Sequence, residues 1–114
     1  MSHMDSQRSR AEMLKEWRAW AESVARAAKE ILPKLEVYVL GSVVRGDYTG
    51  GSDIDILIVS DTTPEGLLKR AELKSSIEDA ANLPRTHQIQ IHITGRSEAK
   101  NYIRRAGKHI IKLI

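Results

Sequence analysis

The 114-residue sequence has no cysteine and no phenylalanine, and it has only two tryptophans and three tyrosines. Without cysteine there can be no disulfide framework, no thiolate metal site and no cysteine nucleophile. Because large aromatic rings are scarce, the hydrophobic core must be built from Ile, Leu, Val and Ala. Such a core in so short a chain gives a thin margin of stability, so we expect a homo-oligomer or a partner chain.

The sequence also lacks a long apolar run and a strong excess of charge. No apolar stretch approaches the roughly 18 residues of a membrane span and no signal-peptide pattern is present, so we expect a cytoplasmic protein with no membrane partner. Lys and Arg total 18 against 15 Asp and Glu, a net charge of +3. That balance gives little support to nucleic-acid binding by charge alone. The apolar fraction of 41% excludes an intrinsically disordered chain.

The hydrophobic pattern predicts one α/β (α+β) domain, a small mixed sheet flanked by helices in the order α-β-β-α-β-α. Residues 1–4 are typical of a cloning scar, and residues 5–114 are expected to form the domain. Apolar residues recur at helical spacing in the helices and alternate in the strands. The expected elements are a helix over 7–31, strands over 35–40 and 53–59, a helix capped by Thr63 with Pro64 first and ending near Ala81, a strand over 88–94, and a helix capped by Ser97 and interrupted at Gly107.

The last residues combine an apolar tail with basic side chains. The tail, Ile110–Ile114, is expected to dock on the domain or on a second subunit, because an exposed stretch of that kind would be an association site. The basic residues are expected to form a solvated helix face, or else to steer a polyanion. They are Arg104, Arg105, Lys108 and Lys112.

The chemically informative segment runs from Gly41 to Asp55. A glycine and a serine, Gly41-Ser42, end a predicted strand and expose backbone N–H groups to an anion such as phosphate, and the Ser42 hydroxyl adds a donor. Asp53 and Asp55 lie two residues apart on the next strand, so both carboxylates leave the same face with Cβ atoms ~7 Å apart. Paired carboxylates recruit a cation, and Mg²⁺ takes one or two of them together with substrate phosphates. This layout predicts phosphoryl or nucleotidyl transfer from a nucleoside triphosphate.

Gly41-Ser42, ten further residues and then Asp53-Ile54-Asp55 resemble the GS-x10-DxD signature of the DNA polymerase β-like nucleotidyltransferase superfamily. The resemblance is greatest to its small prokaryotic members, the minimal nucleotidyltransferases (MNT), and it covers most of the chain, so residues 5–114 are expected to be one nucleotidyltransferase domain. It implies that Gly41 and Ser42 hold the triphosphate, that Asp53 and Asp55 ligate Mg²⁺, and that pyrophosphate is released. Arg45 lies where a basic side chain would reach phosphate.

The chain departs from the family pattern at the third carboxylate. In the superfamily a later strand supplies this group as a metal ligand and general base, and the matching position here is Gln90. An amide can coordinate a cation through its carbonyl oxygen but cannot accept a proton. His92, on the same strand face, is an alternative base, because histidine titrates near neutral pH.

Two functions from different classes follow from the resemblance. The first is a Mg²⁺-dependent enzyme that transfers a nucleoside monophosphate, AMP from ATP, to a protein or small-molecule hydroxyl, with Gln90 or His92 completing the site. The second is a weakly active or non-catalytic nucleotide-binding antitoxin or accessory subunit, since many minimal nucleotidyltransferases are paired with a helical HEPN-domain protein in toxin–antitoxin couples. A third and weaker reading, a basic nucleic-acid-binding module, predicts steeply salt-dependent binding and no role for Asp53.

Overall fold

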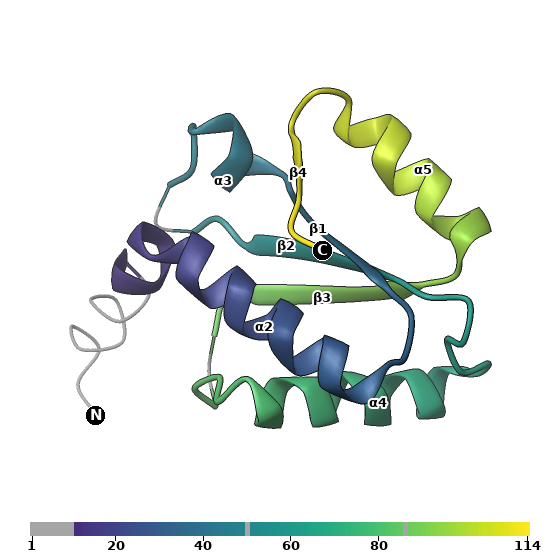
Figure 1. The fold of residues 1–114 in the computed structure, drawn as a ribbon. Coiled ribbons are helices and arrows are strands. Elements are labelled where there is room, and N and C mark those ends of the chain that lie inside the picture. Colours follow the sequence, from purple (N-terminus) through teal and green to yellow (C-terminus); the bar gives the residue numbers. More distant parts are fainter. Residues whose placement is uncertain (1–10, 50, 86) are drawn as a thin grey trace.

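The computed structural model describes residues 11–49, 51–85 and 87–114, so the expected cloning scar lies outside the described residues. Four strands form one mixed sheet in the order β3-β2-β1-β4 (Figure 1). Strand β1 is antiparallel to β2 and to β4, and β2 is parallel to β3. The strand bounds are β1 Glu36–Leu40, β2 Ile54–Val59, β3 Ile89–Thr94 and β4 Ile110–Lys112.

Helices cover both faces of this sheet, which confirms the predicted mixed α/β fold. Figure 1 shows α2 and α4 on one side of the sheet and α5 on the other. The helix bounds are α2 Trp17–Ile31, α3 Ser42–Arg45, α4 Leu67–Ala80 and α5 Arg96–Ala106. The predicted helix over 7–31 is interrupted, because a turn at Glu16 separates helical residues 11–15 from α2. None of the helices in the described ranges is long and apolar enough to cross a membrane.

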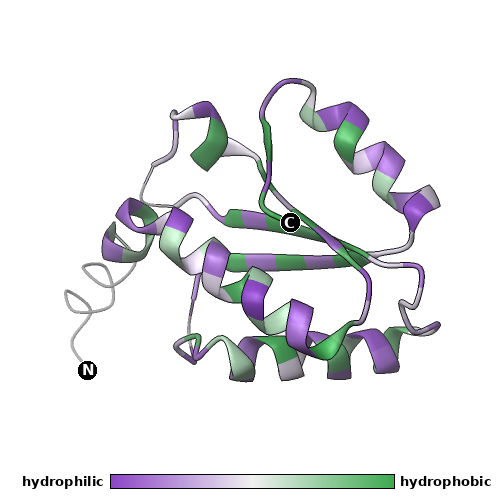
Figure 2. Cartoon of the chain, in the orientation of Figure 1, coloured by the Kyte–Doolittle hydropathy of each residue, from purple (hydrophilic) through white to green (hydrophobic). Residues whose placement is uncertain are grey.

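The main core lies between the sheet and the pair α2 and α4. Every second residue of β2, Ile54, Ile56 and Ile58, is fully buried on this face, as its alternation predicts. The apolar strands and the polar outer sides of the helices are visible in Figure 2. Burial of one such isoleucine is worth about 1.5–3 kcal/mol, so packing on this face contributes strongly to the stability of the fold. On the opposite face Leu57 and Val59 pack with Ala99 of α5.

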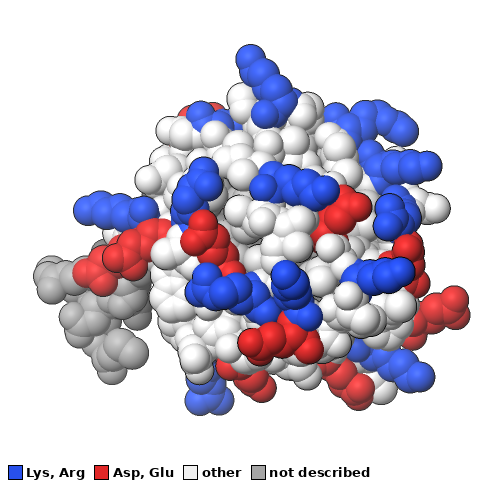
Figure 3. Space-filling model, viewed as in Figure 1, with Lys and Arg blue, Asp and Glu red and all other residues white. Residues whose placement is uncertain are grey.

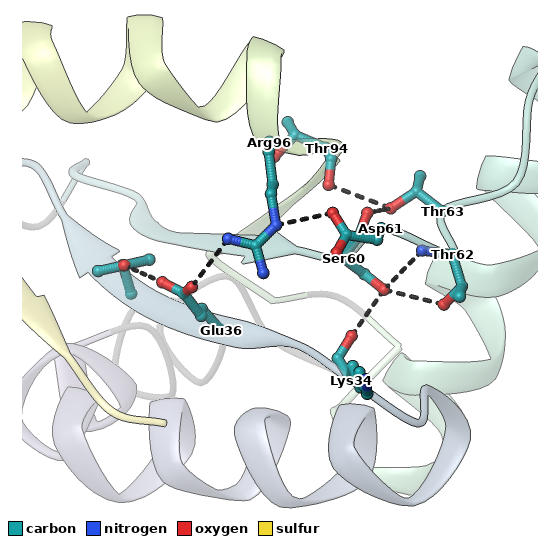
Figure 4. A network of polar contacts seen from close by, with 9 residues as sticks. Lys34, Glu36, Ser60, Asp61, Thr62, Thr63, Thr94 and Arg96 are labelled. Carbon is teal, nitrogen blue, oxygen red and sulfur yellow. Dashed lines mark hydrogen bonds and ion pairs between the residues drawn. The ribbon is translucent and has the colours of Figure 1, made fainter.

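Both predicted helix caps are wrong. Helix α4 begins at Leu67, three residues after Pro64, with Gly66 as the preceding residue and no side-chain cap. The Thr63 hydroxyl donates to the carbonyl oxygens of Ser60 at 2.8 Å and Thr94 at 3.1 Å (Figure 4), and so joins the ends of β2 and β3.

Helix α5 likewise begins before its predicted cap. It starts at Arg96 with Gly95 as the preceding residue and no side-chain cap, so that Ser97 lies in the first turn. Arg96 is fixed by two acidic groups, Asp61 at 2.7 Å and Glu36 at 3.7 Å (Figure 4). These ion pairs attach the start of α5 to the ends of β1 and β2.

The C-terminal tail docks on the domain, which was one of the two expectations, and it does so as a fourth strand, which the sequence pattern did not predict. Strand β4 pairs with β1, and Lys112 aligns with Tyr38. The Lys112 ammonium lies 3.7 Å from the Glu36 carboxylate, so this lysine is an ion-pair partner and not part of a free basic face. Tyr38 also donates a hydrogen bond to Glu36. That bond raises the pKa of Tyr38 to about 12 and lowers the pKa of Glu36.

The outer side of β3 is one of the two edges of the sheet, and side chains occupy its backbone groups at both ends. The Ile89 N–H donates to Nδ1 of His87 at 3.1 Å. The Ile93 carbonyl accepts a hydrogen bond from Nη1 of Arg70 at 3.4 Å, and Arg70 is itself held by Glu98 at 2.9 Å. These two contacts hinder another strand from pairing at either end of this edge.

Candidate functional site

A cavity of about 340 Å³ opens on the α5 face of the sheet. It brings together residues from β1, α3, β2, β3 and α5, and four of them were singled out from the sequence. Its volume is near the lower end of the ~300–1,000 Å³ usual for small-molecule sites, so it suits one small ligand. The lining residues are Leu40, Gly41, Arg45, Asp55, His92, Tyr102, Arg105, Ala106 and His109.

Gly41 is packed directly against Asp55. A Cβ atom added to Gly41 would lie 2.8 Å from Oδ2 of Asp55, and the glycine has φ of +91°. Both facts disfavour a side chain at this position, since that distance is shorter than real Cβ contacts and that backbone conformation favours glycine. Ser42 follows as the first residue of α3 and is partly buried. The predicted glycine-serine turn therefore meets the predicted carboxylate.

The two predicted metal ligands have different surroundings. Asp55 lies in β2 and lines the cavity, and its Oδ1 is 3.2 Å from Nε2 of His92. Each of these two side chains is 32% exposed. Asp53 immediately precedes β2, is exposed, and is not among the cavity-lining residues.

Gln90 lies at the register position that the third ligand requires. In the parallel β2–β3 pair, Gln90 aligns with Asp55, so their side chains leave the same face of the sheet. Gln90 is exposed and does not line the cavity. His92 does line it, but its Nε2 is already in contact with Asp55, which leaves Nδ1 as the nitrogen available to a ligand.

Arg45, the last residue of α3, lines the cavity as an exposed side chain. Its Nε lies 3.3 Å from Oδ1 of Asp47. Asp47 lies in the segment between α3 and β2, next to this guanidinium. An exposed pair of this kind contributes little to stability, so Arg45 is free to exchange its partner for a phosphate.

Three of the polar lining residues were missed from the sequence as site residues: Tyr102 and Arg105 of α5, and His109 in the loop that follows. Arg105 was expected to belong to a solvated basic face, or else to steer a polyanion. The spacing of three residues between Tyr102 and Arg105 places these two along one side of the helix, and His109 lies beyond its end. No motif links them to the glycine-serine turn, because the packing of α5 on the sheet brings them there.

The donor set fits a cation shared with a ligand. In the described part of the chain, no three His, Asp or Glu side chains are close enough together to hold a metal ion by themselves. Asp55 in the cavity and Asp53 two residues earlier supply up to two carboxylates. Mg²⁺ is commonly bound by one or two protein carboxylates and completed by substrate phosphates and water, so these residues are compatible with Mg²⁺ bound together with a nucleotide.

A glycine turn packed on a strand carboxylate, above a small mixed sheet, defines a nucleotidyltransferase-like domain. Residues 21–111 match the family described as "Nucleotidyltransferase domain", and the chain therefore belongs to that family. This match confirms the predicted resemblance to the minimal nucleotidyltransferases.

Solved structures agree with this assignment. A candidate nucleotidyltransferase from Sulfolobus solfataricus is 28% identical with a TM-score of 0.60, and the similarity covers 92% of this chain and 82% of that chain. A second candidate nucleotidyltransferase is 32% identical with a TM-score of 0.63, over 80% of this chain and 94% of that chain. No curated protein matches the sequence.

Proposed function

We propose that this protein is a Mg²⁺-dependent nucleotidyltransferase that transfers AMP from ATP to a hydroxyl group of a protein or a small molecule. The observation that carries the proposal is the contact between Gly41 and Asp55, where a Cβ atom would lie only 2.8 Å from the carboxylate. This contact supports a site in which the backbone of the glycine-serine turn and a metal-binding carboxylate act on the same phosphate group.

In this proposal the residues of the chain bind and orient the nucleotide. Asp53 and Asp55 would hold Mg²⁺, which when bound neutralises phosphate charge and orients the phosphates. The Ser42 hydroxyl donates a hydrogen bond to a phosphate oxygen, and Arg45 exchanges Asp47 for phosphate. His92 keeps the Asp55 carboxylate oriented through its Nε2 contact of 3.2 Å.

The transfer forms a bond between the acceptor oxygen and the α-phosphorus of ATP, and it breaks the bond from that phosphorus to the bridging oxygen of the leaving pyrophosphate. The acceptor hydroxyl must also lose its proton. Gln90 cannot take this proton because an amide has no useful basicity, so the proton passes to water or to His92, the alternative base that lines the cavity. Because position 90 holds no carboxylate, we expect slow turnover.

The direct test is a calorimetric titration of the wild-type protein with ATP and with a non-hydrolysable analogue, each with and without Mg²⁺. We expect binding of both nucleotides that is strong only when Mg²⁺ is present, because the metal links the carboxylates to the phosphates. Absence of nucleotide binding in the presence of Mg²⁺ would contradict the proposal.

A second candidate function is a nucleotide-binding antitoxin or accessory subunit of a HEPN-type helical partner, with weak or no transferase activity. The amide of Gln90, exposed beside Asp55 in the register, favours it because general-base catalysis is absent at that position. The size of the cavity agrees with either function. A cavity that holds one small ligand leaves the acceptor group to be supplied by another molecule, which can be a substrate or a partner chain.

Gln90→Glu separates the two candidates. If the protein is an enzyme weakened by its amide, a carboxylate at this position should raise Mg²⁺-dependent pyrophosphate release from ATP by about tenfold or more, since general-base catalysis is typically worth about 10²–10⁴-fold. Gln90→Met, which removes the amide without supplying a base, is the control and should not increase the rate. Equal rates in wild type and Gln90→Glu would remove position 90 from the proposed catalytic site.

A further inference from the structure

Helix α5 forms a second wall of the cavity, and it contributes Arg105, which has no role in the proposed function. Arg105 reaches the cavity from α5, whereas Gly41 reaches it from the turn after β1 and Arg45 from α3. Figure 3 shows blue side chains grouped over the α5 side of the molecule. Of the basic residues Arg104 and Arg105 at the end of this helix, only Arg105 lines the cavity.

The guanidinium of Arg105 is held in place on an aromatic ring. Its Cζ lies 5.3 Å from the centroid of the Tyr102 ring, and its Nε donates to the Asn101 carbonyl at 3.4 Å. The Tyr102 ring packs against the cluster of Leu57, Val59 and Ala99 under α5. A guanidinium stacked on a fixed ring loses less conformational freedom when it binds a ligand.

Arg105 also differs in its charge balance from Arg45, the other arginine that lines the cavity. Arg45 pairs with Asp47 and Arg70 with Glu98, whereas among the described residues no carboxylate lies within ion-pair distance of Arg105. The one carboxylate that lines the cavity, Asp55, is in contact with His92. A pre-positioned guanidinium without an acidic partner matches phosphate, which accepts two parallel hydrogen bonds from it.

We propose that Arg105 binds phosphate oxygens of the nucleotide from the α5 wall, and that Tyr102 is the positioning residue that holds its guanidinium there. This inference rests on the proposed nucleotide site and adds phosphate contacts from the opposite side of that site. The site then holds the triphosphate between the glycine-serine turn with Arg45 on one side and Arg105 on the other. Such a contact depends on phosphate and not on the identity of the base.

The test compares Arg105→Gln with Arg104→Gln, a neighbouring substitution that removes the same charge outside the cavity. Calorimetric affinities are measured for Mg²⁺–ATP and for Mg²⁺–tripolyphosphate, which has phosphates and no base. Arg105→Gln should weaken both by about tenfold or more, as expected for loss of a charge-assisted hydrogen bond, and Arg104→Gln should weaken neither by more than about twofold.

Several outcomes would overturn the assignment. Wild-type affinity for ATP in Arg105→Gln would do so while leaving the proposed function intact. A loss for ATP without a loss for tripolyphosphate would assign Arg105 to the base or the sugar. No tripolyphosphate binding by the wild type would contradict a contact that depends on phosphate alone. An equal loss in Arg104→Gln would indicate a general charge effect. No nucleotide binding by the wild type would overturn the proposed function together with this inference.

Tyr102 is tested through its effect on Arg105. Tyr102→Phe keeps the ring and should retain wild-type affinity, whereas Tyr102→Met should weaken tripolyphosphate binding almost as much as Arg105→Gln. The double variant Tyr102→Met/Arg105→Gln should be no weaker than Arg105→Gln, because a residue that acts through another adds nothing once its partner is gone. Additive losses, or a loss in Tyr102→Phe, would contradict the positioning role. If Tyr102→Met does not fold, Tyr102→Leu replaces it in the same comparison.

Discussion

Replacing Asp53 with alanine is expected to abolish the Mg²⁺-dependent part of ATP binding and to leave the fold intact. Asp53 is exposed and precedes β2, and exposed substitutions of this kind usually change stability by no more than about 0.5 kcal/mol. Its carboxylate is nevertheless one of only two that the proposed metal site can use. Calorimetric titration with ATP, with and without Mg²⁺, measures the loss, and thermal unfolding checks the fold.

A matched control lies at the opposite end of the same strand. Asp61 is also exposed and follows β2 by two residues, where it pairs with Arg96 at 2.7 Å. Asp61→Ala should therefore retain Mg²⁺-dependent ATP binding. If Asp53→Ala binds Mg²⁺–ATP as tightly as Asp61→Ala does, Asp53 is not a metal ligand.

The second large effect is expected for Gly41→Ala, which should lower both the stability and the affinity for ATP. The backbone at this residue has φ of +91° and ψ of −156°, a region that residues with a Cβ atom rarely adopt, at a cost of about 1–3 kcal/mol. The added methyl group would also meet Oδ2 of Asp55 at 2.8 Å and displace that carboxylate. Urea unfolding should show the loss of stability, and calorimetry should show ATP affinity lowered by about tenfold or more.

Gly46→Ala separates the two causes. Gly46 has φ of +85°, yet a Cβ atom built there meets nothing within 4 Å. This variant therefore also places a Cβ atom at a positive φ, in the left-handed α region, but without the collision with Asp55. It should lose stability and keep its affinity for ATP. Similar ATP affinities for the two variants would mean that the contact with Asp55 does not matter for binding.

The strands were predicted well from the sequence where apolar and polar residues alternate most regularly. Strands β1, β2 and β3 each begin one residue later than predicted and end where predicted, because apolar residues alternate along them. The helix starts were predicted poorly, since local capping rules do not show that the Thr63 hydroxyl bonds to the carbonyl of the distant Thr94. Strand β4 was missed because its three residues gain regular structure only by pairing with β1.

Only one side of the candidate site could be predicted from the sequence. The spacing of Gly41-Ser42 from the two aspartates indicated which residues would meet, and the structure packs Gly41 on Asp55. The α5 wall was not predictable, because Tyr102 and Arg105 reach the cavity only through the packing of α5 on Leu57 and Val59. Roles that depend on bound groups, including those of Asp53 and Gln90, remain predictions.

The side chains at the two ends of β3 bear on how copies of this protein behave at high concentration. His87 occupies the Ile89 N–H and Arg70 occupies the Ile93 carbonyl, so a strand from another molecule would have to displace both side chains before it could pair along the whole length of β3. Edge-to-edge growth is the usual route from a folded β-sheet to insoluble aggregates. At both ends of this isoleucine-rich strand, the chain thus hinders such growth with side chains of its own.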